Sequence, residues 1–314
     1  MFLGAGGTLR QSPRPASGPG TGRNADTANK RASMEHSPIT SAQNRQVSLV
    51  RRILSHPQEA RREGVLVADG IHLVQEAIRA GLRCRSLFVT IDESKAEITA
   101  VLALAHELHL PVYRVADRLF RSISGLETPQ GVVGVFERPG ADRPEAGLPA
   151  GWGQVEPVRG HMAIADGLQD PANIGSLARS ALGAGFRALV TTPGTVDPFH
   201  HRALRAAQGA SFYLPHLLDE PPAPLADRLK QIGYLTVGLC PGGDQELTDL
   251  DPAQPTALFL GSERAGLGPI ALSAVSRRVR IPIEPGVESL GVAAAGAVAF
   301  FWLRLARRID SRAD

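Results

Sequence analysis

Three segments of the chain place glycine, amide, hydroxyl or charged side chains directly after an apolar run that predicts a β-strand. These segments are residues 165–179, 258–268 and 279–295. Ligands of open α/β sheets bind outside the carboxyl ends of the strands, where such side chains and backbone amides gather. The three segments are therefore candidates for one ligand site.

The first segment runs from Ala165 to Arg179. We expect a strand to end at about Ala165 and a helix to begin near Asn173, whose side chain suits an N-cap. Arg179 then lies about one and a half turns along that helix, and Gly175 permits close approach of a backbone or a ligand. Taken alone, this segment is explained better by capping and a surface arginine.

The second segment is a hydrophobic strand followed by a loop that contains Gly261, Gly266 and Gly268, with one carboxylate at Glu263. Backbone amides of such a loop can hold a polar ligand, and the carboxylate can accept hydrogen bonds from hydroxyls or amines. The glycine spacing does not fit a dinucleotide-binding turn, which argues against a nucleotide-dependent oxidoreductase. By itself, a generic turn is the simpler interpretation.

In the third segment, Ser289 precedes a helix rich in small residues and follows a strand that contains Pro282. The serine hydroxyl can cap that helix, and the alanines after it permit close packing against a neighbouring backbone. A capped core helix accounts for most of this pattern without a ligand.

Apolar periodicity divides the chain into four parts. Residues 1–40 lack such periodicity and predict a disordered basic tail, and residues 138–158 have the proline and glycine content of a linker. Strands alternate with helices in residues 41–137 and again in residues 159–310, which predicts two α/β domains. In the second domain, strands are expected at 162–165, 188–191, 234–239, 257–260 and 279–283, and helices at 174–184, 200–208 and 290–307.

The composition, at 43% hydrophobic and 21% charged residues, is typical of a soluble globular protein. No apolar run reaches the roughly 18 residues of a membrane span, and Cys84 and Cys240 have neither disulfide-framework nor metal-ligand spacing. We therefore expect a cytoplasmic protein with no membrane segment and no metal. The acid-poor start leaves open a true tail, a transit peptide or a start at Met34.

The formal net charge of +3 equals that of the first 40 residues, so the remainder is close to neutral. A nucleic-acid binder with this balance needs local basic patches. Aromatic residues make up only 5% of the chain, so a stacking platform for bases has few candidates.

Together, the order, separation and content of the three segments resemble the signature motifs of the SpoU/TrmH family of RNA ribose 2′-O-methyltransferases, within the SPOUT superfamily. The resemblance covers nearly all of residues 160–305. The front domain is similar to the family's substrate-binding domain through residues 65–77 and 128–131, and residues 1–40 lie outside the match.

This resemblance implies an α/β domain at 159–310 whose last segment threads a loop to make a trefoil knot. It also implies that residues 41–137 are a small α/β RNA-binding domain similar to a ribosomal-protein fold. The active form would be a homodimer, packed partly through the closing helix. The cofactor would be S-adenosylmethionine, held by residues of the second and third motifs: Leu260, Gly261, Ser262, Gly266, Ile281, Ile283, Ser289 and Leu290.

For catalysis, the resemblance places Arg179 near the target nucleotide, where it would bind phosphate and help to activate the hydroxyl. It implies that Asn173 shapes the pocket, that Glu263 holds the second-motif loop and that Ser289 lies near the target ribose. A ribose 2′-hydroxyl is a poor nucleophile whose proton must be withdrawn as it attacks. Because arginine is a poor free base, we assign Arg179 mainly a positioning role.

The third motif departs from the family pattern, which reads Ser-Leu-Asn where this chain has Ser289, Leu290 and Gly291. The difference removes a side-chain amide from the site. A non-catalytic or tRNA-directed RNA-binding member of the same fold is therefore the alternative hypothesis. The retained Arg179, Glu263 and Ser289 favour an active enzyme.

Ribosomal RNA is expected as the substrate in preference to tRNA, because the front domain resembles a ribosomal-RNA-type binder. Its candidate phosphate ligands are five arginines near the start of that domain: Arg45, Arg51, Arg52, Arg61 and Arg62. Phosphate contacts of this kind would make RNA binding weaken steeply with salt. An ordinary solvated face is the alternative for this cluster.

Overall fold

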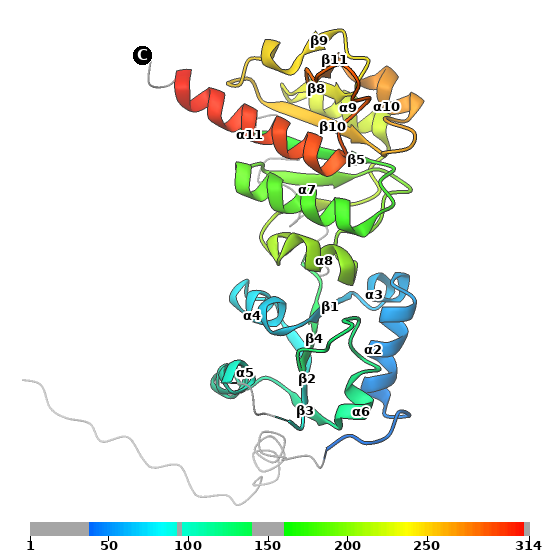
Figure 1. The fold of residues 1–314 in the computed structure, drawn as a ribbon, viewed down its shortest axis with the longest axis vertical. Helices are drawn as coiled ribbons and strands as arrows, with labels where there is room; N and C mark the ends of the chain where they lie inside the picture. The colour runs from blue at the N-terminus through cyan, green and yellow to red at the C-terminus, as the bar shows by residue number, and fades with distance from the viewer. Residues whose placement is uncertain (1–37, 93–95, 140–159, 311–314) are drawn as a thin grey trace, which may run out of the picture. The chain divides into compact units, whose positions relative to one another are not determined.

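The computed structural model describes residues 38–92, 96–139 and 160–310, which contain two β-sheets with helices packed on both faces of each (Figure 1). The expected tail at 1–40 and linker at 138–158 fall almost wholly outside the described residues. At the border of the tail, Ile39 forms an isolated parallel bridge with Val115.

The first sheet has the order β1-β4-β2-β3. Strand β4 is antiparallel to β1 and to β2, whereas β2 and β3 are parallel. The elements of this region are α2 (Arg45–Ser55), α3 (Gln58–Arg62), β1 (Val65–Asp69), α4 (Ile71–Arg79), β2 (Cys84–Thr90), α5 (Ala96–Glu107), β3 (Val112–Val115), α6 (Asp117–Phe120) and β4 (Val132–Glu137).

Side-chain alternation along β1 builds two hydrophobic cores from one strand. Successive side chains of a strand point to opposite faces of the sheet. Leu66 and Ala68 accordingly pack with α4 and α5, and Val65 and Val67 pack with α2 and α6. The buried strand residues are therefore apolar on both faces, as a sheet covered by helices on both sides requires.

The second sheet has the order β7-β6-β5-β10-β8-β11-β9, and every neighbouring pair in it is parallel. Its strands therefore present their carboxyl ends along one edge. The elements are β5 (Met162–Asp166), α7 (Pro171–Ala184), β6 (Ala188–Thr191), α8 (His201–Ala207), η1 (Ala210–Phe212), β7 (His216–Leu217), α9 (Pro222–Gln231), β8 (Leu235–Leu239), β9 (Gln245–Glu246), η2 (Leu247–Asp249), β10 (Thr256–Gly261), α10 (Pro269–Ala274), β11 (Arg277–Arg280) and α11 (Val292–Asp310).

The two faces of this sheet are again assigned by alternation. Leu258 and Leu260 of β10 lie in the core that contains α7 and α11, whereas Ala257 and Phe259 lie in the core that contains α9 and α10. A three-layer arrangement with a parallel sheet follows, and it confirms the expected α/β class.

Two glycines bring the helices of the α7 face close to their neighbours. A Cβ added to Gly175 would lie 2.2 Å from the carbonyl oxygen of Ala203, so α7 meets the backbone of α8 at this point. A Cβ on Gly296 would lie 2.3 Å from the Leu177 side chain. The first contact confirms the expectation that Gly175 admits a neighbouring backbone.

Some element boundaries differ from those expected. The last strand ends at Arg280 and not at Ile283, since Pro282 has no backbone N–H to donate to a sheet ladder. Helix α9 was not expected, because it starts with the Pro-rich stretch Pro221 to Pro224, although proline is well suited to a first helical turn. Within the described ranges, no helix is long and apolar enough to span a membrane.

Candidate active site

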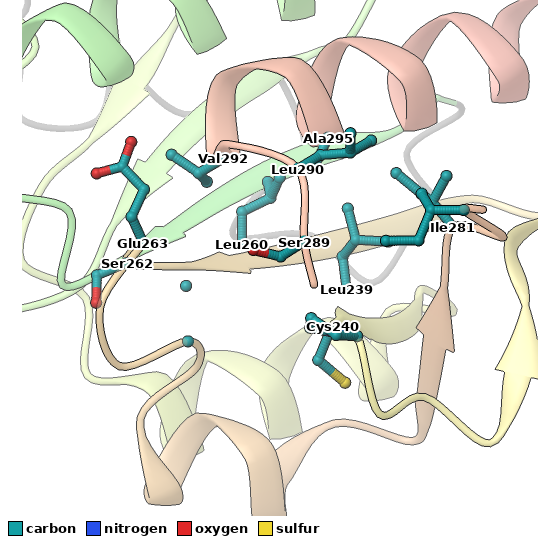
Figure 2. A pocket seen from close by; sticks show the side chains of 14 residues that line it. Leu239, Cys240, Leu260, Ser262, Glu263, Ile281, Ser289, Leu290, Val292 and Ala295 are labelled. Atoms are coloured by element: carbon teal, nitrogen blue, oxygen red, sulfur yellow. The ribbon is translucent and has the colours of Figure 1, made fainter. Parts of the chain in front are cut away.

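A cavity of about 280 Å³ opens at the carboxyl ends of β8 and β10, where the loop after β11 and the first turn of α11 close over them. Figure 2 shows the apolar side chains of Leu239, Leu260, Ile281 and Leu290 gathered between these strand ends and α11, with Glu263 at one end of the group. The position is the one that parallel α/β sheets use for ligands.

The cavity brings together residues of the second and third motifs. All eight residues expected to hold the cofactor line it, namely Leu260, Gly261, Ser262, Gly266, Ile281, Ile283, Ser289 and Leu290. Glu263 lines it as well. Segments up to 30 positions apart in sequence thus share one site, because the intervening β11 returns the chain to the same edge of the sheet.

Five further lining residues were not expected from the sequence: Leu239, Cys240, Pro241, Val292 and Ala295. Leu239 is the last residue of β8, a strand whose existence and end were expected, and Cys240 and Pro241 directly follow it. The sequence signal for the first three is the end of the expected strand, but its place beside β10 follows from their parallel pairing, which only the structure shows.

The second-motif loop is a tight backbone hairpin. The Ser262 amide donates to the Gly266 carbonyl at 3.0 Å, and the Gly266 amide donates to the Ser262 carbonyl at 2.8 Å. A Cβ on Gly261 would lie 2.0 to 2.1 Å from the backbone of Gly266 and Leu267. This glycine is therefore a steric requirement of the loop that forms one wall of the cavity.

Asn173 connects the first motif to the second, since its side-chain amide donates a hydrogen bond to Oε1 of Glu263. The expectation that Asn173 caps its helix was wrong. The cap is Asp170, whose carboxylate accepts from the Ala172 amide at 2.9 Å, with Pro171 in the first helical position. The helix begins earlier than expected because proline suits that position, and Asn173 is left to bond across the site.

Ser289 lines the cavity but does not cap α11. The helix begins at Val292, and the Gly291 carbonyl accepts from the Ala295 amide at 2.9 Å. Ser289 lies two residues before Gly291, outside the capping position, so its hydroxyl is available to the cavity. A Cβ on Gly291 would have no neighbouring atom within 4 Å.

Arg179 is exposed on α7 and is not among the residues that line the cavity. It makes no hydrogen bond or ion pair with the part of the chain that the structure describes. Asn173, on the same helix, donates to Glu263, so the first turn of α7 reaches the site, whereas Arg179 lies six residues further along and is turned by about 120° from Asn173.

The cavity walls are mostly apolar, with polar groups confined to a few positions. Burial raises the pKa of the Cys240 thiol, an effect that nearby Arg278 opposes and Asp244 reinforces, so the thiol is protonated and neutral at neutral pH. Hydrophobic walls with few polar groups are typical of small-molecule sites. In the described part of the chain, no cluster of three or more His, Cys, Asp or Glu side chains could hold a metal ion.

The five candidate RNA-binding arginines have different surroundings. Arg45 and Arg52 line a second cavity, beside the first sheet. Arg61 forms an ion pair with Asp219, and Arg62 forms one with Glu59 at 2.7 Å. Arg51 is exposed on α2 and lines neither cavity.

Comparisons with known proteins agree on one family. Residues 161–301 match the model of the SpoU rRNA methylase family, and residues 68–140 match a model described as RNA 2′-O ribose methyltransferase substrate binding. The chain is 28% identical to the 23S rRNA (guanosine(2553)-2′-O)-methyltransferase of Bacillus subtilis over 85% of this chain and 98% of that protein. An uncharacterized tRNA/rRNA methyltransferase of Mycobacterium bovis is 30% identical, over 76% of this chain and 80% of the relative.

Solved structures share the fold. The AdoMet-bound rRNA methyltransferase from Sinorhizobium meliloti has a TM-score of 0.72 at 23% identity, covering 86% of this chain and 98% of that chain. The SpoU methyltransferase AviRb from Streptomyces viridochromogenes, in complex with AdoMet, has a TM-score of 0.71 at 24% identity, covering 85% of this chain and 100% of that chain. These likenesses extend across both sheets.

Proposed function

The chain belongs to the SpoU rRNA methylase family, and on that premise we propose that it transfers a methyl group from S-adenosylmethionine to a ribose 2′-hydroxyl of ribosomal RNA. The observation that carries this proposal is the cavity at the strand ends, which unites the second and third motifs in one wall. The relative from Bacillus subtilis, named for 2′-O-methylation of 23S rRNA, supports the choice of RNA.

The residues present fit S-adenosylmethionine. Its adenine ring needs apolar walls, which Leu239, Leu260 and Leu290 offer, and its polar atoms need backbone donors and acceptors, which the loop 261–266 offers. A side chain on Gly261 would displace this loop. When bound, the cofactor supplies an electrophilic methyl group on a sulfonium sulfur.

The protein's part in the reaction is to orient the ribose and exclude water, because methyl transfer to an oxygen needs in-line placement more than covalent help. Ser289, which lines the cavity, would donate to or accept from the target ribose. Arg179, exposed on the same helix as Asn173, would bind a phosphate of the target nucleotide. The Asn173–Glu263 hydrogen bond would hold the second-motif loop in position beneath them.

The finer architecture is also proposed. The family resemblance supports a trefoil knot in residues 159–310 and a ribosomal-protein-like fold for the front domain. Two free cysteines at separate places support a reducing, cytoplasmic location.

A homodimer would use the solvent-exposed apolar face of α11. Val298, Phe301 and Leu305 are 45%, 40% and 52% exposed and recur at helical spacing. Such a row of large apolar side chains on one side of a long helix supports an interface with a second copy.

The second candidate function, a non-catalytic RNA binder, is favoured by Gly291, which lacks the amide side chain of the family pattern. Calorimetry with S-adenosylmethionine separates the two functions. Cofactor binding supports the enzyme, whereas binding of ribosomal RNA without cofactor binding supports the RNA-binding module.

The test of the proposed function is transfer of a radiolabelled methyl group from S-adenosylmethionine to purified ribosomal RNA, with tRNA in parallel. We expect label in ribosomal RNA and a loss of about 100-fold in rate for Arg179→Ala, the size seen when one transition-state contact is removed. Arg277→Ala, at an exposed arginine on β11, is the matched control and should retain the rate. Absence of label in both RNA pools would refute the catalytic proposal.

A further inference from the structure

A second cavity, of about 1070 Å³, lies on the first domain between α2 and the start of β2. We call it the arginine groove. Its charged lining consists of four arginines and two glutamates: Arg45, Arg52, Arg83, Arg85, Glu63 and Glu137. The lining therefore has an excess of two positive charges on a chain whose globular part is nearly neutral.

Helix geometry places two of these arginines on one side of α2. Arg45 and Arg52 are seven residues apart, so their side chains project within about 20° of each other around the helix axis. Arg51 is turned by about 120° from Arg45, and it does not line the groove. Of these three arginines of α2, only Arg45 and Arg52 therefore line the groove.

A β-bulge supplies the opposite wall. Cys84 pairs with Phe136 and Ser86 with Val135, so Arg85 is an extra residue on β2 with no partner of its own on β4. A bulge redirects the side chain that it carries. Arg85 and the adjacent Arg83 both contact Oε1 of Glu137, each at 3.3 Å.

These ion pairs position Arg83 and Arg85 and leave guanidinium N–H groups of both available to a ligand. Arg83 is 79% exposed, and its partner Glu137 also serves Arg85, so one carboxylate faces two guanidinium groups. Both arginines are solvent-exposed, at 79% and 42%, and ion pairs of exposed arginines contribute little stability. A phosphate can therefore replace the carboxylate as the partner of either arginine.

The floor of the groove contains an unsatisfied polar atom. Ser86 is 1% exposed and lines the groove, and its Oγ has no hydrogen-bond partner among the described residues. Buried hydroxyls are usually hydrogen-bonded. A polar ligand or its water would satisfy this one.

The polar residues of the lining favour the ribose-phosphate backbone over the bases. Gln43, Gln46 and Ser48 add side-chain donors and acceptors, and no lining residue is aromatic. Unpaired bases are typically bound by stacking on aromatic side chains, whereas double-helical RNA is bound through phosphates and 2′-hydroxyls.

Building on the proposed function, we propose that the arginine groove binds the sugar–phosphate backbone of a double-helical element of the substrate RNA. The groove would hold the RNA by its shape and charge, and the site at the strand ends of the second sheet would act on the ribose. Sequence preference would then come from the target site and not from this domain.

The experiment measures fluorescence anisotropy of the full chain with a blunt RNA duplex, a single strand of the same sequence and the matching DNA duplex, over a salt series. We expect the RNA duplex to bind tightest. Arg83→Ala/Arg85→Ala should weaken duplex binding at least tenfold and lower the salt slope by about two, roughly one per phosphate contact. Arg45→Ala should lower the slope by about one.

Two variants serve as comparisons. Arg118→Ala, at an exposed arginine of α6, should bind the duplex like the wild type. Arg51→Ala tests the direction of the side chains, because it removes the same charge from the same helix as Arg45→Ala. Three results would each refute the proposed role of the arginine groove. They are equal losses of duplex affinity from the two α2 variants, tighter binding of the single strand than of the duplex, and unchanged duplex binding by Arg83→Ala/Arg85→Ala.

Calorimetry and methyl transfer with the same variants keep this result separate from the proposed function. Groove variants should bind S-adenosylmethionine with unchanged affinity. If the chain methylates RNA but binds the duplex equally well with and without the groove arginines, only the proposed RNA-binding role of the groove is contradicted. A chain that binds the duplex through the groove but never transfers a methyl group contradicts only the proposed function.

Discussion

At the residue scale, the site depends on side chains that line the cavity and on others that hold its walls. Leu260 and Leu290 line it, whereas Asn173 fixes the loop that carries Glu263. Gly261 contributes through the absence of a side chain, since a Cβ at this position would collide with the backbone of Gly266. The sequence identified these positions but assigned Asn173 a capping role, because the choice between Asp170 and Asn173 as cap depends on where Pro171 starts the helix.

Gly261→Ala should weaken S-adenosylmethionine binding while the protein remains folded. Its Cβ would lie 2.0 Å from the Gly266 backbone, so the loop must move. Overpacking of this kind costs about 1–3 kcal/mol, or about 5- to 150-fold in affinity. Calorimetry measures the affinity, and circular dichroism checks the fold.

Gly242→Ala is the matched control, because a Cβ at Gly242 meets no atom within 4 Å. It introduces the same methyl group just after the lining residue Pro241. If both variants bind the cofactor like the wild type, the loop 261–266 does not form the cofactor wall.

Gly291→Asn should raise the rate of methyl transfer. The position has open space around it, so the amide that the family pattern carries there can be accommodated without strain. One added hydrogen bond contributes about 0.5–1.5 kcal/mol, or about 2- to 10-fold in rate. Steady-state kinetics with ribosomal RNA measures the change, and a rate at or below that of the wild type would show that backbone or water already serves in place of the amide.

At the element scale, α11 has two faces with different roles, one packed on the same chain and one exposed. Its buried side, through Gly296 and Phe300, packs on α7 and β10 and places its first turn over the cavity. Its opposite side is apolar and exposed. Helical periodicity predicts that this element exists, but it does not show which apolar face is covered by the same chain and which is left for a partner.

Phe301→Glu should convert a dimer into a monomer. The substitution places a charge in the middle of the exposed row formed by Val298, Phe301 and Leu305, where burial of an unpaired carboxylate is unfavourable. Size-exclusion chromatography with light scattering gives the mass. Ile270→Glu, at a 59% exposed isoleucine of α10, is the control and should leave the mass unchanged, whereas equal masses for wild type and Phe301→Glu would exclude this face as the interface.

At the scale of the whole molecule, the chain order of strands and helices predicted the α/β class, since periodicity reports which faces are buried. It did not predict the order in which strands pair. The cavity depends on β8 and β10 being neighbours, although β9 lies between them in sequence. Leu239 and Cys240 were missed for this reason, because pairing between distant segments is decided by packing and not by any local pattern.

The stability of the fold should fall on acidification. Burial lowers the pKa of His216 to about 4, although Asp197 opposes the shift and Arg138 adds to it. Its Nε2 lies 3.2 Å from the Ser211 carbonyl, and its Nδ1 has no partner among the described residues. The folded protein therefore favours the neutral imidazole of His216 over the protonated form.

Because the folded pKa is below the unfolded value, the stabilisation is present above pH about 6.5 and is lost as pH falls toward about 4. The contribution of His216 is on the order of 3 kcal/mol at most. Urea unfolding across this range should show a shallower decline for His216→Phe than for the wild type. Identical slopes for the two proteins would mean that His216 does not carry the effect.

Identification of the methylated atom tests the central claim most directly. The full chain is incubated with methyl-labelled S-adenosylmethionine and ribosomal RNA, and the RNA is then hydrolysed in alkali. A methyl group on the 2′-oxygen blocks its attack on the neighbouring phosphodiester, so we predict that the label is recovered in alkali-resistant dinucleotides. Label in mononucleotides would place the methyl group on a base, and that result, or the absence of transfer, would contradict ribose 2′-O-methylation by this chain.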